Sequence, residues 1–320
     1  MKPFRTVCKI GLLGAFFFML PALAQDSNIL MPVSEIEQRL KYEPFEIFKL
    51  QGSRYESDLT KRVILKWPNN VYLQAKWKRA APGGWADNNE PRYEIAAYQL
   101  QKLFLEPEEY VVPPTVGKCL PVSQYKMIEP GVDPTFKNTS SVYFVLQYWL
   151  EQVSPDEIFN KDRFDEDPRY ARHLANMNIL SYLIEHKDSN VGNFLISTDP
   201  ENPRVFAVDN SLAFGSAESN RGTRWRKIRV NRLPQSTIDK LRKISRENLH
   251  ATLGIVEQYE IREYGRLVPI PPTENLNPDK GVRTSDKVIQ FGLTAYEIDQ
   301  VYDRLQNLLE GVDSGKYETF

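Results

Sequence analysis

Three polar residues in the middle of the chain have the types and the spacing that phosphoryl transfer uses. Asp188 lies in the run HKDSNVGN, which ends at Asn193, and the strand-like run VFAV leads directly into Asp209. An Asp on a tight loop can accept the proton of an attacking hydroxyl. An Asn later on the same loop and a second Asp at a strand end can hold a metal ion against nucleotide phosphates. The spacing therefore suits transfer of a phosphoryl group from a nucleotide to a hydroxyl.

The same residues are also ordinary turn formers. Asp and Asn beside Gly192 favour turns, and Asp-Asn-Ser after a strand is a common exit from a sheet. The chain matches the pattern H-R-D-x-x-x-x-N with Lys187 in place of Arg, and the D-F-G that follows in that pattern reads D-N-S here. Because such a motif has meaning only in the right structural context, the surrounding elements must decide between the two interpretations.

The strand predicted upstream points two lysines to one side. Residues 71–78 read VYLQAKWK, in which Lys76 and Lys78 share one face while Ala75 and Trp77 share the other. A rigid strand can aim such an ammonium at the α- and β-phosphates of a nucleotide. Two lysines on one strand face are also often simply solvated.

A helix is predicted next, over residues 92–104, because apolar side chains recur at helical spacing in RYEIAAYQLQKLF. Glu94 lies in its first turn, where an acidic side chain favours the helix dipole. The same carboxylate could instead pair with the strand lysine and fix its ammonium. Glu90 is an alternative partner for that lysine.

Two further segments offer groups to a nucleotide. Gly52 and Ser53 lie in the turn of a predicted hairpin, where their N–H groups could contact phosphates. One glycine is few for a phosphate loop, so an ordinary loop is the better local interpretation. Groups from Gln147 to Leu150, at the end of an apolar strand, could hydrogen-bond an adenine edge, and a buried core strand is the alternative.

The predicted elements are strand-rich to about residue 150 and helix-rich afterwards. Strands are expected at residues 45–50, 61–67, 71–78, 120–128, 142–150, 194–196 and 205–208, with a basic strand within 221–232. Helices are expected at residues 33–40, 92–104 and 170–185, from a Ser236 cap to 253, and from a Thr294 capping box to 310. This order predicts an α+β, two-lobed architecture with an N-lobe over residues 25–150 and a C-lobe over residues 151–320.

Composition excludes several classes of protein. The chain has 320 residues, a net charge of −1 and a pI near 6.4, so no global field attracts nucleic acid or a membrane surface. His173, His186 and His250 lie far apart and form no Cys/His cluster, which argues against a zinc site. Beyond the first segment, Cys119 is the only cysteine in the sequence and cannot form an internal disulfide.

The first segment has the pattern of a secretory signal peptide over residues 1–24. A basic start precedes an apolar run over residues 10–20, and Ala22-Leu23-Ala24 forms a small-x-small cleavage site. An uncleaved anchor is the alternative, but the apolar run is short for a membrane span. The pattern predicts a secreted or periplasmic protein with no stable membrane span after cleavage.

With these elements in order, the chain resembles the atypical kinase-like group. That group includes phosphoinositide-kinase-like folds, HipA-type kinases, and secretory-pathway kinases related to four-jointed and the Golgi casein kinase. The likeness to the secretory kinases rests on the strand lysine, on EIAAY at 94–98, on VPPTV at 112–116, and on Asp188 followed by DNS at 209–211 and Phe214-Gly215. It spans roughly residues 60–220. The phosphate loop departs from the group because it is barely glycine-rich, no disulfide set is present, and the loop over residues 189–192 looks closer to the HipA-like form.

The resemblance implies a bilobal protein-kinase-like fold with a strand-rich N-lobe and a helix-rich C-lobe. It implies Asp188 as catalytic base, Asn193 and Asp209 as metal ligands, Lys76 on the phosphates with Lys78 as its register-shifted alternative, and Glu94 orienting that lysine. The expected cofactors are ATP or another nucleotide with Mg²⁺ or Mn²⁺, and the partner is a hydroxyl-bearing acceptor, protein or small molecule. The alternatives are a catalytically inactive pseudokinase that serves as a binding module, and a lipid or small-molecule kinase.

Overall fold

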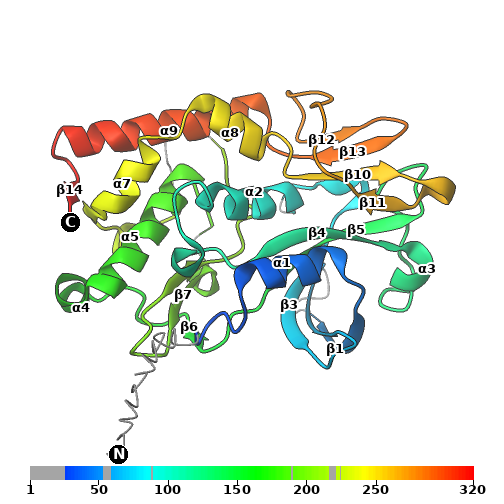
Figure 1. Ribbon diagram of the computed structural model, residues 1–320, viewed down its shortest axis with the longest axis horizontal. Helices are drawn as coiled ribbons and strands as arrows, with labels where there is room; N and C mark the ends of the chain where they lie inside the picture. Colours follow the sequence, from blue (N-terminus) through cyan, green and yellow to red (C-terminus); the bar gives the residue numbers. More distant parts are fainter. Residues whose placement is uncertain (1–25, 53–58, 88, 189, 216–220, 224) are drawn as a thin grey trace, which may run out of the picture.

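The structure is a computed structural model that describes residues 26–52, 59–87, 89–188, 190–215, 221–223 and 225–320 (Figure 1). The predicted signal peptide, residues 1–24, and Ser53 lie outside these described residues. The first half is built on a five-stranded antiparallel sheet with the order β1-β2-β3-β5-β4. Its strands are β1 (Glu46–Gly52), β2 (Thr60–Lys66), β3 (Tyr72–Arg79), β4 (Thr115–Pro121) and β5 (Ser141–Tyr148).

The core of this sheet forms around Trp77 of β3. Its indole stacks on Phe144 of β5 at 3.8 Å between ring centroids and donates from Nε1 to the Tyr125 hydroxyl at 2.8 Å. Every residue of β5 is buried, and β5 lies between β3 and β4, so the predicted apolar strand is a central strand. Because side chains alternate along β3, burying Trp77 turns Lys76 and Lys78 to the opposite face.

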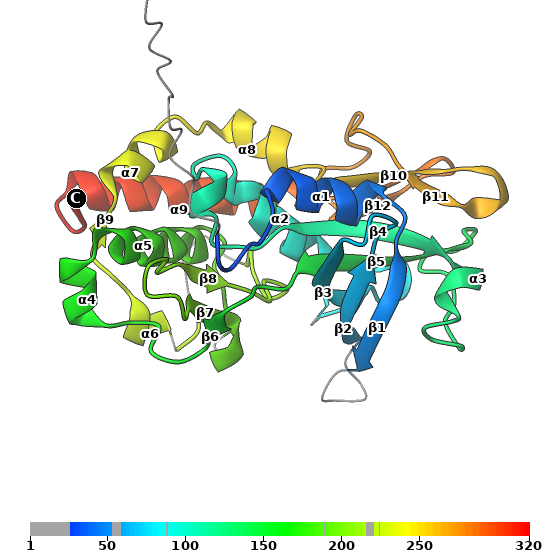
Figure 2. The same ribbon diagram turned by 60° about the horizontal axis from the view of Figure 1, so that its bottom comes forward.

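Two helices flank this sheet. Helix α1 (Val33–Tyr42) packs along β4, and α2 (Pro91–Gln101) lies close to it in both views (Figures 1 and 2). Pro91 occupies the first position of α2, where its missing N–H is not needed. At the other end, Gln101 accepts from the N–H groups of Val111 and Val112 at 2.9 Å and so ties α2 to the chain entering β4.

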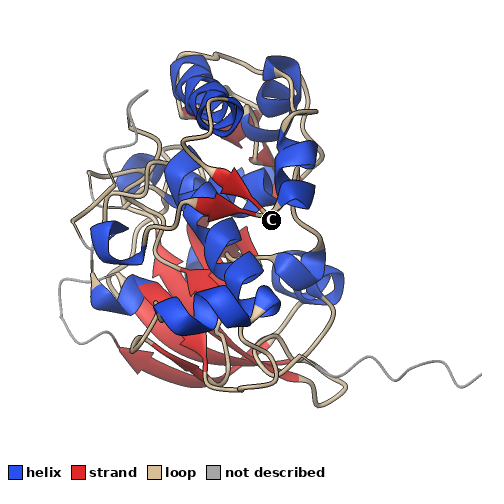
Figure 3. Cartoon of the chain, turned by 90° about the vertical axis from the view of Figure 1, so that its left-hand side faces the viewer, coloured by secondary structure: helices blue, strands red, loops and turns tan. Residues whose placement is uncertain are grey.

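The second half is mainly helical, and seen from that end several helices stand in front of the large sheet (Figure 3). Its helices are α4 (Lys161–Glu166), α5 (Pro168–Leu183), α6 (Trp225–Ile228), α7 (Gln235–Leu241), α8 (Arg246–Leu253) and α9 (Ala295–Asp313). Its strands include the small antiparallel sheet of β6 (Val153–Ser154), β7 (Phe194–Ser197) and β8 (Val205–Ala207), and the parallel pair of β9 (Arg232–Leu233) and β14 (Glu318–Thr319). Helix α5 thus leads the chain into the loop that carries Asp188.

A four-stranded sheet near the C-terminus was not expected. It has the order β11-β10-β13-β12, with β10 (Glu257–Ile261), β11 (Leu267–Pro269), β12 (Val282–Thr284) and β13 (Val288–Phe291). The ring of Phe291 stacks on Tyr143 of β5 at 4.1 Å, which seats this sheet against the first one. The proline-bearing loop predicted from residue 269 to 285 joins β11 to β12, and its last residues form β12. The sequence did not predict these strands because they are too short to show a period.

Two predicted strands are wrong. The strand over residues 120–128 ends at Pro121, after which Val122–Tyr125 forms the short helix α3. The basic strand within residues 221–232 contains the short helix α6 and only the start of β9. Both errors arise in short elements, where tertiary contacts override local propensity.

The helix expected from Ser236 to residue 253 is two helices. Ser245 accepts from the Asn248 N–H at 3.2 Å in a capping box, so a new helix begins there. The capping box at Thr294 is confirmed, since its hydroxyl accepts from the Glu297 N–H at 3.1 Å. The last helix, however, continues past Gly311 to Asp313.

The α+β class with strand-rich and helix-rich parts is confirmed. Among the described residues, no helix has the length and the apolar content to cross a bilayer.

Removal of the Trp77 indole should destabilise the fold strongly. Trp77→Ala leaves a cavity between β3 and β5 and an unpaired Tyr125 hydroxyl, so we expect the free energy of unfolding to fall by about 3–5 kcal/mol. Trp85→Ala is the matched control, because Trp85 is 55% exposed and its loss should cost less than about 0.5 kcal/mol. Urea denaturation measures both, and equal costs would contradict this account of the core.

Candidate active site

A charge cluster joins β3, α2 and the end of β8. The Lys76 ammonium lies 3.1 Å from Glu94 Oε1 and 3.0 Å from Asp209 Oδ1. The Glu94 side chain is only 2% exposed, whereas that of Asp209 is 38% exposed. The structure therefore brings together three residues that the sequence singled out, from three separate elements.

Lys78 approaches the same carboxylates from one pleat further along β3. Its ammonium lies 3.8 Å from Glu94 and 3.6 Å from Asp209, and it donates to the Ser211 hydroxyl at 3.1 Å. Lys76 therefore makes the closer ion pairs, while Lys78 completes the cluster behind it. Ser211 belongs to the DNS run quoted above but had no predicted role of its own, because its contact with Lys78 spans 133 residues.

The cluster fixes the charge state of its members. Burial disfavours the charged form of Lys76, but Asp209 and Glu94 outweigh it and raise the pKa of Lys76 above its ordinary value. The Lys76 ammonium lowers the pKa of Asp209 far below its ordinary value, against the opposing effect of burial. At neutral pH the site therefore holds an ammonium next to an ionised carboxylate.

The backbone after β8 holds Glu94 in place. The Asn210 N–H donates to Glu94 Oε2 at 3.0 Å, so the second carboxylate oxygen is also bonded. Asp209 itself has a φ of +58°, in the left-handed region that Asp tolerates better than most residues. Glu90, the alternative partner for the lysine, pairs with Arg92 at 3.0 Å instead.

Helix α9 anchors α2 close to Glu94. Arg92 makes a bidentate pair with Glu297, at 2.6 and 2.9 Å, and the Tyr93 hydroxyl also donates to Glu297. Arg92 is 7% and Glu297 8% exposed, so water screens this pair little. The sequence predicted Glu297 only as half of a capping box, since its partner lies 205 residues away.

The same helix contacts the segment that leads to Asp188. Arg304, which is fully buried, donates from Nε to the Leu183 carbonyl at 2.7 Å and lies 3.9 Å from Glu185. Glu185 is also buried and has a φ of +50°. Glu297 and Arg304 are about two helical turns apart on α9. One face of α9 therefore contacts both α2 and the end of α5.

Among the described residues, no hydrogen bond or ion pair joins Asp188 to the charge cluster. Asp188 is half-buried, and its Oδ1 accepts from the Asn190 N–H at 2.9 Å in a local turn. His186, two residues earlier, is fully buried and packs its ring on Trp225, and burial lowers its pKa. The structure thus does not place Asp188 in contact with Lys76 or Asp209.

A cavity of about 630 Å³ opens beside the cluster. Lys76, Gln147, Asn193 and Asp209 line it together with the segment from 148 to 153 that leaves β5. The Gln147 amide is buried and donates to the Thr115 hydroxyl at 3.0 Å. The cavity is therefore lined both by charged residues of the cluster and by the segment from 148 to 153.

Unsatisfied polar atoms gather near Asp209. The side-chain amide nitrogen of Asn193, both polar side-chain atoms of Asn210, and His186 Nδ1 are buried and have no hydrogen-bond partner among the described residues. Each such atom costs free energy unless a bound group satisfies it. Asn193 and His186 contact the backbone of Val208, and Asn210 follows Asp209, so these atoms belong to the stretch that carries the candidate metal ligand.

Asp209 and Asn193 could hold a divalent metal. Both line the same cavity, and carboxylate and amide oxygens suit Mg²⁺ and Mn²⁺. Among the described residues no group of three or more His, Cys, Asp or Glu side chains has metal-binding geometry. The residues therefore fit a metal that takes its remaining ligands from phosphates and water, as Mg²⁺ commonly does.

Proline at position 114 affects the hydrogen bonding of Tyr148, where the chain leaves β5. The Tyr148 N–H donates to the Pro114 carbonyl at 2.8 Å, in continuation of the β4–β5 ladder. Proline has no N–H to return, so the Tyr148 carbonyl receives no hydrogen bond from that residue. Tyr148 lines the cavity.

The phosphate-binding role expected of Gly52 and Ser53 stays a prediction. Gly52 ends β1, is exposed, and does not line the cavity beside the cluster. Its neighbour Ser53 lies outside the described residues.

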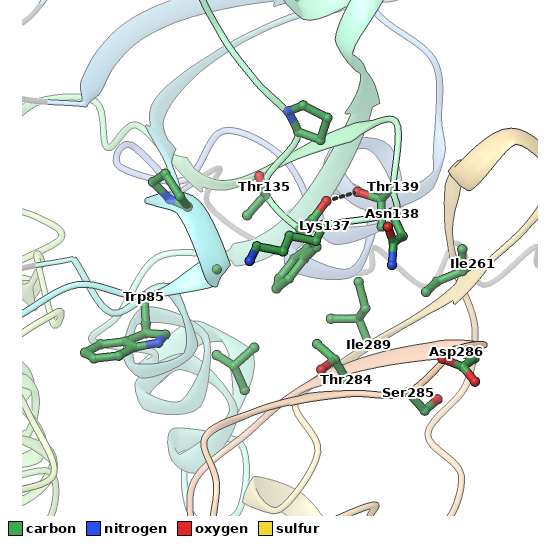
Figure 4. Close-up of a pocket in the computed structure, with 15 residues that line it drawn as sticks. Trp85, Thr135, Lys137, Asn138, Thr139, Ile261, Thr284, Ser285, Asp286 and Ile289 are labelled. Atoms are coloured by element: carbon green, nitrogen blue, oxygen red, sulfur yellow. Dashed lines mark hydrogen bonds between the residues drawn. The ribbon is translucent and has the colours of Figure 1, made fainter.

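A larger hollow of about 910 Å³ lies elsewhere, between the loops near Trp85 and Lys137 and the β12–β13 turn (Figure 4). In this view Lys137 and Asp286 stand apart, on opposite sides of the hollow. None of the residues selected from the sequence lines it. The smaller cavity is therefore the better candidate for chemistry, despite its size.

The sequence matches no family model, and no curated protein matches it either. The fold is similar to the Golgi casein kinase solved with Mn and ADP bound, with a TM-score of 0.51 and 15% identity over 87% of this chain and 74% of that one. Other similar structures are Fam20 of hydra with sugar, at a TM-score of 0.49 and 14% identity over 88% of each chain, and another Golgi casein kinase structure, at 0.49 and 12% over 87% and 74%.

At these identities the likeness concerns the fold alone. The predicted resemblance to the phosphoinositide-kinase-like and HipA-type folds stays a prediction. The chain has a bilobal, α+β, kinase-like fold.

Proposed function

We propose that this chain binds a nucleoside triphosphate with a divalent metal and transfers its γ-phosphoryl group to a hydroxyl. One observation carries the proposal: Lys76 and Asp209 pair at 3.0 Å while both line the 630 Å³ cavity. The similar Golgi casein kinase structure holds Mn and ADP, which supports the same ligand class here. The acceptor is a protein or a small molecule.

Each residue has a defined task in this proposal. Lys76 neutralises charge that develops on the phosphates, and Glu94 fixes the position of its ammonium. A metal held by Asp209 and Asn193 would supply further positive charge at the same phosphates. The acceptor hydroxyl gives its proton to the Asp188 carboxylate as its oxygen bonds the γ-phosphorus. The bond from that phosphorus to the bridging oxygen breaks, and the nucleoside diphosphate leaves.

The nucleobase would lie along the segment that leaves β5. The Tyr148 carbonyl is the first acceptor on that segment, and Gln147 lies directly opposite Lys76 in the register of the β3–β5 pair. We place the boundary between the two lobes here, close to residue 150. With the signal-peptide pattern of residues 1–24, the proposal is an exported enzyme, secreted or periplasmic.

A pseudokinase is the second candidate, and the position of Asp188 favours it. Asp188 does not line the cavity that holds Lys76 and Asp209. An exported protein also meets little ATP outside a bacterial cell, so the donor could be another nucleotide. A lipid or small-molecule kinase remains compatible with the same site, since the acceptor chemistry is shared.

Asp209→Asn should remove metal-dependent nucleotide binding. The change takes away a charged ligand, so we expect affinity for ATP with Mg²⁺ or Mn²⁺ to fall at least thirtyfold, about 2 kcal/mol. Thermal shift measures it, because ligand binding to the native state raises Tm. Asp199→Asn, on the turn between β7 and β8, is the matched control. An unaltered shift in Asp209→Asn would count against the proposal.

Asp188→Asn should separate binding from chemistry. Loss of the proton acceptor should reduce nucleoside diphosphate release by about 10²–10⁴-fold while nucleotide affinity stays unchanged. Water serves as acceptor in this assay, so the natural acceptor is not needed. A wild-type protein that binds nucleotide but releases no diphosphate with water or any added acceptor is a pseudokinase, and equal rates for both proteins would remove Asp188 from the mechanism.

A further inference from the structure

The segment from Asp26 to Tyr42 precedes the five-stranded sheet and touches both ends of the candidate site. We propose that it is a brace that positions α2, and that Glu37 is its positioning residue for Glu94. The effect on nucleotide binding rests on the proposed function, but the placement of α2 does not.

The brace begins at the segment that leaves β5. Asn28 is fully buried, and its side-chain amide donates to the carbonyls of Glu151 and Gln152 at 3.0 and 3.1 Å. The Asn28 carbonyl accepts from the Glu151 N–H at 3.1 Å. Three hydrogen bonds thus join one residue of the brace to the segment that lines the cavity.

The same stretch is fixed to the second half of the chain. Asp26 forms an ion pair with Arg204, which is 2% exposed, and accepts from the Asn202 amide at 3.2 Å. The Leu30 N–H donates to the Tyr148 hydroxyl at 3.2 Å. The start of the brace is therefore bonded both to the end of β5 and to the chain just before β8.

Helix α1 is seated as firmly on the first sheet. Ile36 and Leu40 are fully buried in its core. The Lys118 ammonium of β4 donates to the Lys41 and Glu43 carbonyls at 3.1 and 2.9 Å, which satisfies the free carbonyls at the end of α1. Because α1 is fixed to the sheet, a residue of α1 can fix the position of a neighbouring helix.

What α1 contacts is the face of α2 that carries Glu94. The Tyr98 hydroxyl donates to Glu37, and the Lys102 ammonium pairs with Glu37 at 2.7 Å. Residues four apart in a helix lie one above the other, so Glu94, Tyr98 and Lys102 follow one another along α2. Glu37 therefore holds α2 one and two turns beyond the carboxylate that pairs with Lys76.

The contact of Glu37 with Lys102 and Tyr98 should affect the position of α2 more than the stability of the fold. The side chains of Glu37 and Lys102 are 29% and 26% exposed, so their pairing is partly screened by water. Burial, with Glu37 nearby, raises the pKa of Tyr98, so its phenol stays protonated and donates. Loss of Glu37 should loosen α2 while the core stays intact.

Acylation of Lys76 reports on α2 directly. An N-hydroxysuccinimide ester reacts with the free amine, and the ion pair with Glu94 keeps Lys76 protonated. In Glu37→Ala we expect Lys76 to be labelled about twofold to fivefold faster at neutral pH, as measured by peptide mass spectrometry. The exposed Lys126 serves as an internal reference.

Two variants separate positioning from general damage. Glu35→Ala, which breaks an ion pair with Arg39 inside α1, should leave Lys76 labelling unchanged. The exchange Glu37→Lys with Lys102→Glu restores an ion pair and should return the labelling rate toward the wild type. If Glu37→Ala unfolds, Lys102→Met tests the same contact from the other side.

Equal labelling in the wild type and in folded Glu37→Ala or Lys102→Met would overturn the proposal, as would a failure of the exchanged pair to restore it. Nucleotide affinity provides the second readout, with an expected loss of about twofold to fivefold in Glu37→Ala. Should the wild type bind no nucleotide, the proposed function fails, while the labelling result still decides whether the brace exists.

Discussion

The ion pairs of Lys76 with Glu94 and Asp209 are the constraint on which the rest of this site depends. Glu94 is almost fully buried, and a buried carboxylate without a partner costs several kcal/mol. Its partners lie 18 residues away on β3 and 116 residues away on the backbone after β8. The sheet, helix α2 and the second half of the chain must therefore converge on one point, and the cavity lies where they do.

The elements that hold this point come from both ends of the chain. Helix α9 binds α2 through the ion pair of Glu297 with Arg92. It also contacts the end of α5, a few residues before Asp188, through the hydrogen bond from Arg304 to the Leu183 carbonyl. The segment before the first sheet contacts α2 through Glu37, and it contacts the segment that leaves β5 through Asn28. A kinase-like core thus depends on flanking helices for its alignment. The site could respond to anything that displaces those helices.

The sequence alone was enough to predict the features that depend on local residue patterns. Alternation along β3 placed Lys76 and Lys78 on one face, and helical spacing placed Glu94 near the start of α2. The contacts that align these elements were not predictable, because Arg92 and Glu297 or Asn28 and Glu151 lie more than a hundred residues apart and have no local signal. The second sheet was missed for a related reason: strands of three to five residues show no clear period. The roles of Asp188, Asn193 and Asp209 stay predictions, although Asn193 and Asp209 share a cavity.

The charge cluster also preorganises the site. Lys76 lowers the pKa of Asp209, so this carboxylate is ionised before any ligand arrives. Lys76 pairs with this carboxylate at 3.0 Å, so the two charges balance each other. If the proposed function holds, the Lys76 ammonium would pair with a phosphate and the Asp209 carboxylate would help to hold a metal, which would supply positive charge at the same phosphates. Charges held in this way need less reorganisation than charges brought together from water, which is the advantage of a preorganised polar site. Because Asp209 is also the most exposed member of the cluster and sits on a left-handed backbone, it is the one placed to change partner.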